Sequence, residues 1–300
     1  MRYLIKLSYD GAEFCGWQFQ PNAVTVQECL ERTLSTLLKE PVQVVGAGRT
    51  DSKVNAIGYV AHFDYDKVID TPSFGYKLNA ILPRGIVVHS VNVADGDLHA
   101  RFCATRREYT YFLHRTKDPF IETRSYYCPW GLDVKAMNEA AALLTGTHDF
   151  RCFEKAGSDN RTSVCTVYEA FWAPYTPDHV AVMGFAPAAP RPAGTGMLSR
   201  SCGDDGTLPK EPVYLYFRIA ADRFLRNLVR ATVGSLIEVG RGRRSVADFA
   251  ALILPPDFAA DHDPATSPDR LRTAADGTPF RSLAGESVPG HALFLSRVDY

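Results

Sequence analysis

Residues 44–60, VVGAGRTDSKVNAIGYV, place a glycine-containing turn between two apolar runs, and this arrangement decides the fold class. The run before the turn, VQVV at 42–45, predicts a short strand. GYVAHFDYD at 58–66 alternates apolar and polar residues, which predicts a second strand. No helical pattern lies between them. Because parallel neighbours are usually joined by a helix, such a pair favours antiparallel pairing.

Predicted strands and helices alternate along the rest of the chain. Further strands are predicted at 2–11, 85–93, 107–115, 178–186, 212–220 and 292–300, and helices at 25–39, 134–146 and 224–240. Several neighbouring strands have no helix between them. We therefore expect an α+β fold with antiparallel pairing rather than a doubly wound parallel sheet.

Bulk composition excludes several classes of protein. The net charge is −1, so any anion-binding surface must come from local clustering. The seven cysteines are odd in number and form no C-x-x-C pair, which argues against a zinc ribbon or a disulfide framework. No apolar run approaches the roughly 18–20 residues of a membrane span. We expect a cytoplasmic protein that does not enter a membrane.

The glycine turn, GAGRTD at 46–51, matches neither common phosphate-binding pattern. A P-loop needs G-K-[ST] after its spacer, and a dinucleotide-binding turn needs G-x-G-x-x-G at the start of a helix. Two interpretations stay open on these residues alone. Asp51 caps the backbone of a plain turn, or Arg49 and Asp51 face a ligand.

Arginine is concentrated in two places. Six arginines and two acidic residues lie between 222 and 244, and Arg223, Arg226 and Arg230 would share one stripe of the predicted helix. A second cluster surrounds the predicted strand that carries Tyr109: Arg101, Arg106, Arg107 and Arg115. A solvated charged face is the simpler interpretation of such runs. However, arginine without lysine suits bidentate phosphate contacts, and arginine among aromatic residues suits RNA.

Six segments, in this order, resemble the TruA-type tRNA pseudouridine synthases. They are YDGAEFCGWQFQ with TVQECLERTL, GAGRTDSKVNAIGYVAHF, HARFCATRREYTYFL, GTHDF, DRFLRNLVRATVGSLIEVGRG and ALFLSRVDY. The resemblance extends from Tyr9 to Tyr300, apart from two irregular stretches near 186–212 and 255–280. It implies the pseudouridine synthase fold, with two α+β halves, 1–103 and 104–300, around a central cleft.

The resemblance also implies roles for individual residues. Asp51 matches the catalytic nucleophile, Arg230 matches the arginine that pairs with it, and Tyr109 matches the tyrosine against the target base. Leu293 matches a leucine that lines the pocket. The arginines expected to contact RNA are Arg49, Arg101, Arg107, Arg223 and Arg226.

This activity explains why a carboxylate is needed. Converting uridine to pseudouridine breaks the N1–C1′ bond, turns the base and joins C5 to C1′, and a carboxylate can add covalently and leave again. The base must be flipped out of its stem-loop, and Tyr109 offers a stacking surface. No metal or organic cofactor is required.

Two residues after Asp51 depart from the family pattern. Lys53 stands where the family usually has glycine, so a positive φ there would strain the chain by roughly 1 kcal/mol. Asn55 replaces the usual His or Ser, and the sequence does not reveal its role. These departures motivate the alternative of a non-catalytic tRNA-binding protein of the same fold. A third class, a nucleotide-dependent enzyme, lacks a phosphate-binding lysine motif.

The expected partner is therefore tRNA, modified in the anticodon arm at positions 38 to 40. A homodimer is expected from the resemblance. Thermal shift would separate the classes, since tRNA would stabilise the first two and ATP or NAD the third.

Overall fold

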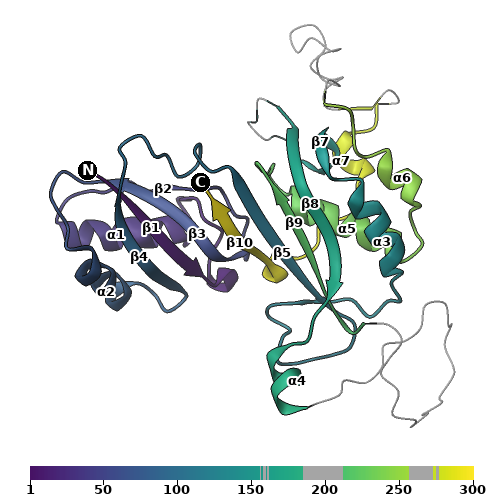
Figure 1. The fold of residues 1–300 in the computed structure, drawn as a ribbon, viewed down its shortest axis with the longest axis horizontal. Coiled ribbons are helices and arrows are strands. Elements are labelled where there is room, and N and C mark those ends of the chain that lie inside the picture. The colour runs from purple at the N-terminus through teal and green to yellow at the C-terminus, as the bar shows by residue number, and fades with distance from the viewer. Residues whose placement is uncertain (156, 158–159, 161, 185–211, 257–272, 275–276) are drawn as a thin grey trace, which may run out of the picture. The chain divides into compact units, whose positions relative to one another are not determined.

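The computed structural model describes residues 1–155, 157, 160, 162–184, 212–256, 273–274 and 277–300 (Figure 1). It contains two compact units. The first comprises 1–110, 220–226 and 293–300, and the second comprises 111–219 and 227–292. These units differ from the expected halves at 1–103 and 104–300. One reason is that the C-terminal strand pairs with a strand of the first unit, at Phe294 with Asn55.

The first unit is built on a sheet. Its strands are β1 (Arg2–Tyr9), β2 (Val45–Gly46), β3 (Asn55–Asp64), β4 (Ile86–Ala94), the first half of β5 (Arg106–His114) and β10 (Leu293–Asp299). β1 lies between β3 and β4 and is antiparallel to both, while β10 runs parallel to β3. β2 pairs antiparallel with β3, as the turn at 46–51 predicts.

Side-chain periodicity explains how this unit folds. Alternate residues of β1, Tyr3, Ile5 and Leu7, are buried. Helix α1 (Val26–Leu38) begins at Thr25, whose hydroxyl accepts a hydrogen bond from the Glu28 amide, and it buries one apolar stripe. Helix α2 (Thr71–Ile81) packs on β4.

The second unit combines strands with five helices among the residues the structure describes. Its strands are the second half of β5, β6 (Tyr126–Tyr127), β7 (Gly146–Asp149), β8 (Val164–Pro174) and most of β9 (Tyr214–Ala221). Its helices are α3 (Val134–Ala142), α4 (Asp178–Met183), α5 (Leu228–Gly240), α6 (Val246–Ala250) and α7 (Phe280–Leu283). The strand order is β5-β9-β8-β7. Helix α5 is almost wholly buried, and α3 packs against it and against β8 (Figure 1).

The α+β class with largely antiparallel pairing is confirmed. Short 3₁₀ turns at Gly11–Glu13, Arg151–Phe153 and Gly290–Ala292 complete the described elements.

One predicted element is wrong, and one predicted helix is shorter than expected. The strand predicted at 178–186 is helix α4, which follows Pro177 and ends at Gly184 with φ +66°. Its alternating apolar residues do not line a core, since Val182 is 84% exposed. The helix predicted at 134–146 stops at Ala142, and Gly146, with φ +114°, begins β7 instead.

Some expectations fall on residues that the structure does not describe. The insertion near 186–212 lies almost entirely outside the described residues, as do 257–272 and 275–276 of the acidic stretch. Six cysteines are described, and all six are free thiols. None of the helices formed by the described residues is long and apolar enough to span a membrane.

Candidate active site

The first glycine of the GAGRTD turn is required by packing. Gly46 ends β2 against the stacked rings of Trp17 and Tyr59, whose centroids lie 4.2 Å apart. A Cβ at position 46 would lie 2.1 Å from the Tyr59 hydroxyl oxygen, so a larger residue would displace the loop. The Ala47 amide donates to the Val60 carbonyl at 2.8 Å and extends the pairing beyond β2.

Hydrogen bonds fix the backbone that leads to Asp51. The Tyr59 hydroxyl donates to the Gly48 carbonyl. The Thr50 and Tyr9 hydroxyls are hydrogen-bonded at 2.8 Å, and both residues are buried. Because these anchors come from β1 and β3, the sheet determines where Asp51 lies.

A tight turn follows Asp51. The Val54 amide donates to the Asp51 carbonyl at 3.2 Å, and the Lys53 amide donates to the Phe14 carbonyl at 3.2 Å. Lys53, at the position where the family usually has glycine, has φ +65° and so adopts the left-handed conformation. The strain is roughly 1 kcal/mol, and the turn nevertheless forms.

Asn55 has a clear structural role that the sequence did not reveal. Its side chain is buried, with its Oδ1 accepting from the Gly11 amide at 2.9 Å and its Nδ2 donating to the Leu293 carbonyl at 3.4 Å. The amide therefore connects the start of β3 to the turn after β1 and to the first residue of β10.

The Asp51 side chain lies at the surface of the loop and is 24% exposed. Its Oδ1 is 3.9 Å from Nε of Arg226, whose side chain is 56% exposed. A contact this long between partly solvated charges is weak. The carboxylate therefore has a cation beside it and still reaches solvent.

Tyr109 on β5 lies close to this carboxylate. Its ring meets that of Phe224 edge to face, with centroids 5.1 Å apart and an interplanar angle of 90°. Burial raises the pKa of the Tyr109 hydroxyl, and the negative charge of Asp51 raises that pKa further. The phenol is therefore neutral at physiological pH and can donate a hydrogen bond, but it is not a base.

The predicted RNA-contacting arginines of the first unit differ in accessibility. Arg49 and Arg101 are exposed, and the Arg101 guanidinium lies over the Phe102 ring, 5.6 Å from its centroid. Arg223 is half-buried. Arg107 points inward, with its guanidinium on backbone carbonyls.

The predicted arginine stripe does not form. Helix α5 begins at Leu228, and Asn227 immediately before it adopts φ +71°, a conformation that asparagine tolerates. Arg223 and Arg226 therefore lie on a loop, and of the three only Arg230 is helical. This loop brings Phe224 to Tyr109 and Arg226 to Asp51, which a continuous helix from 224 would not predict.

The two remaining predicted residues belong to different units. Leu293 is buried at the start of β10 in the first unit, where its carbonyl accepts from Asn55. Arg230 belongs to the second unit, and its Nε donates to the Val288 carbonyl at 2.7 Å. Its expected pairing with Asp51 stays a prediction.

Phe224 is the site residue that sequence reasoning missed, because it was counted only as part of a helix. A signal was present, since Asn227 three residues later is a type that readily leaves helical geometry.

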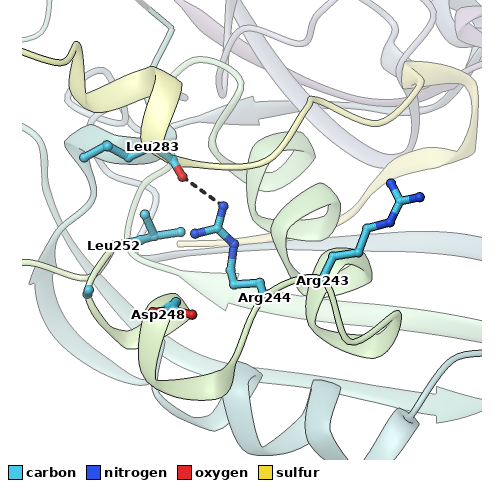
Figure 2. Close-up of a pocket in the computed structure, with 6 residues that line it drawn as sticks. Arg243, Arg244, Asp248, Leu252 and Leu283 are labelled. Atoms are coloured by element: carbon cyan, nitrogen blue, oxygen red, sulfur yellow. Dashed lines mark hydrogen bonds between the residues drawn. The ribbon is translucent and has the colours of Figure 1, made fainter.

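A hollow of about 420 Å³ lies elsewhere, in the second unit (Figure 2). It is lined by Arg243, Arg244, Asp248, Ala251, Leu252 and Leu283. Arg244 is already occupied, since it pairs with Glu238 at 2.9 Å and donates to the Leu283 carbonyl. None of the predicted site residues lines this hollow. Its geometry therefore adds nothing to the chemistry around Asp51.

Comparison with known proteins agrees with the motifs. The sequence model of the family described as "tRNA pseudouridine synthase" matches residues 140–270. The chain is 40% identical to tRNA pseudouridine synthase A of Bacteroides thetaiotaomicron over 299 residues, covering 100% of this chain and 90% of the relative. It is 38% identical to the protein of that name from Bacteroides fragilis, covering 100% and 96% of the two chains.

A more distant relative shows the same extent of similarity. The chain is 34% identical to tRNA pseudouridine synthase A of Bacillus subtilis over 304 residues, covering 100% of this chain and 99% of the relative. The resemblance inferred from six sequence segments is thereby confirmed. This chain belongs to the tRNA pseudouridine synthase family.

Proposed function

We propose that this protein is an isomerase that converts uridine to pseudouridine in the anticodon stem-loop of tRNA, at positions 38 to 40, with Asp51 as nucleophile. Family membership supports the reaction, and full-length relatives carry the name tRNA pseudouridine synthase A.

The observation that carries the proposal is the setting of Asp51. A carboxylate on a loop anchored by Tyr59 and Tyr9 is held in place while its side chain still reaches solvent. Covalent catalysis needs both properties, since the nucleophile must be positioned and must also meet the substrate.

The reaction conserves all substrate atoms except for exchange of one proton. The Asp51 carboxylate adds to the base or to C1′, the N1–C1′ bond breaks, and the base turns. C5 then bonds to C1′, Asp51 is released, and the C5 hydrogen leaves as a proton while N1 gains one. No water is consumed.

Neighbouring residues supply the environment of this step. The neutral Tyr109 ring offers a face on which a flipped uracil stacks, and Phe224 holds the orientation of that ring. Arg226 places a positive charge 3.9 Å from the carboxylate of Asp51. Arg230 is retained in the proposal as the arginine that the family assigns to Asp51, and Leu293 as a wall of the pocket.

The exposed Arg49, Arg101 and Arg226 are proposed to contact phosphates, together with Arg223. We also propose a cytoplasmic homodimer. Sedimentation velocity tests the dimer directly, since a monomer at micromolar concentration contradicts it.

Tritium release tests the function. A tRNA labelled at uridine C5 loses label when the new C–C bond forms, so the wild-type protein is expected to release tritium from a tRNA with uridines at 38 to 40. The same tRNA with cytidine at these positions is the control and is expected to release none. Equal release from the control contradicts the assigned positions. Binding without any release favours the non-catalytic tRNA-binding alternative.

A further inference from the structure

Every N–H group of the Arg107 guanidinium is already hydrogen-bonded to backbone. Nε and Nη2 donate to the Ala47 carbonyl at 3.2 and 3.0 Å. Nη1 donates to the Ala104 carbonyl at 3.2 Å and to the Asp222 carbonyl at 2.6 Å. Nη2 also donates to the Arg101 carbonyl. Arginine has five N–H donors, and these five bonds use all of them.

The accepting carbonyls belong to three separate loops of the first unit. Ala47 precedes Asp51 by four residues on the catalytic loop. Asp222 precedes Arg226 by four residues on the loop before α5 and precedes Phe224 by two. Arg101 and Ala104 lie on the turn between β4 and β5. The planar guanidinium of Arg107 thus fixes the position of the loop that carries Asp51 relative to the loop that carries Arg226.

We propose that Arg107 is a positioning residue that clamps the Asp51 loop to the Arg223–Arg226 loop and does not contact RNA, an inference that rests on the proposed function for its kinetic consequences. This differs from the expectation, from the sequence, that Arg107 contacts RNA. A phosphate would have to displace one of five existing bonds, whereas the exposed Arg101 beside it has its guanidinium free of such a network.

Chemistry favours arginine for this task. Its donors are held in a rigid planar fork, while lysine presents three donors on one atom and cannot span three loops. Burial lowers the pKa of Arg107, as expected for a cation removed from water. The group is nevertheless always charged in proteins, and the carbonyl dipoles around it stabilise that charge.

The clamp and a phosphate contact predict opposite results. Loss of one phosphate contact reduces the slope of log Kd against log[salt] by about 1. Loss of a clamp leaves that slope unchanged and lowers kcat, because a shift of about 1 Å at a reacting group costs roughly 100-fold.

The test compares Arg107→Lys and Arg107→Gln with Arg101→Gln on tRNA labelled at uridine C5. Both Arg107 variants are expected to lose roughly 100-fold in kcat, with KM within about threefold and an unchanged salt slope. Arg101→Gln is expected to reduce the slope by about 1. Restoration of kcat by lysine, or a reduced salt slope in the Arg107 variants, would overturn the proposal.

Amide hydrogen exchange of the free protein separates this inference from the proposed function. In either Arg107 variant, residues 46–51 and 222–226 are expected to exchange faster together, while β3 keeps its protection. This readout needs no RNA. If the wild-type protein released no tritium, the proposed function would fail, but hydrogen exchange would still show whether Arg107 clamps the two loops. Unchanged exchange of residues 46–51 and 222–226 in the Arg107 variants would overturn the proposed clamp. Arg107→Lys keeps the buried charge and serves if Arg107→Gln does not fold.

Discussion

Replacing Lys53 with glycine is expected to stabilise the protein. Lys53 is exposed and holds φ +65° in the turn after Asp51. A left-handed conformation costs a residue with a Cβ roughly 1–2 kcal/mol, which glycine avoids. Glycine also adds roughly 0.5–1 kcal/mol of unfolded-chain entropy, which opposes the gain. The net effect of Lys53→Gly is a stabilisation of roughly 0.5–1 kcal/mol.

Two other lysines of the first unit provide matched controls. Lys39 also has a positive φ, +64°, at the C-terminus of α1, so Lys39→Gly is expected to stabilise similarly. Lys6 is exposed in β1, where φ is extended and glycine only loses entropy, so Lys6→Gly is expected to destabilise by roughly 0.5–1 kcal/mol.

Urea unfolding midpoints of the three variants and the wild type measure the effect. Higher midpoints for Lys53→Gly and Lys39→Gly and a lower one for Lys6→Gly are expected. A midpoint for Lys53→Gly as low as that of Lys6→Gly would refute the reasoning, because it would mean that the turn carries no strain at residue 53.

Three further outcomes follow from single contacts. Asn55→Leu would leave the buried Gly11 amide without its acceptor, so unfolding free energy is expected to fall by roughly 1–3 kcal/mol, as urea unfolding would show. His62 accepts from the Ala100 amide through Nδ1, and burial lowers its pKa to about 4. The pKa of histidine in the unfolded chain is about 6.5, so acid favours the unfolded state, which takes up the proton more readily. The free energy of unfolding is therefore expected to fall by about 2 kcal/mol from pH 7 to pH 5 because of His62. The His62→Gln variant is expected to lack this fall in unfolding free energy between pH 7 and pH 5. An equal fall in the variant would contradict the assignment of the pH dependence to His62. Arg226→Gln is expected to reduce the salt slope of tRNA binding by about 1, and an unchanged slope would remove Arg226 from the phosphate contacts.

The strands were the most predictable part of the fold. Alternation in β1 and at the start of β10 follows a buried face, so the pattern and the physics agree there, whereas the buried residues of β4 and β5 do not alternate throughout. β8 was not predicted. Its buried residues are Cys165, Val167, Ala170 and Trp172, so the period of two slips by one residue in the middle of the strand.

The candidate site was predictable only in part. Motif resemblance predicted roles for Asp51 and Tyr109, and in the structure the negative charge of Asp51 raises the pKa of the Tyr109 hydroxyl. The break at Asn227 was not predictable from apolar spacing, since residues 224–240 keep a helical pattern throughout. The hydrogen bonds of Arg107 reach backbone carbonyls 60 and 115 positions away in the sequence. Every residue type has such a carbonyl, so these bonds could not be predicted from the sequence.

The central claim is that the carboxylate of Asp51 performs the isomerisation. Single-turnover tritium release from tRNA labelled at uridine C5 tests it, with Asp51→Asn compared to wild type and to Asp70→Asn. Asp70 is an exposed carboxylate before α2 whose side chain makes no cap hydrogen bond, so it is a matched control. We expect Asp51→Asn to bind tRNA yet release no tritium, and Asp70→Asn to match wild type. Release by Asp51→Asn within about tenfold of the wild-type rate, a barrier change of about 1.4 kcal/mol, would contradict the claim.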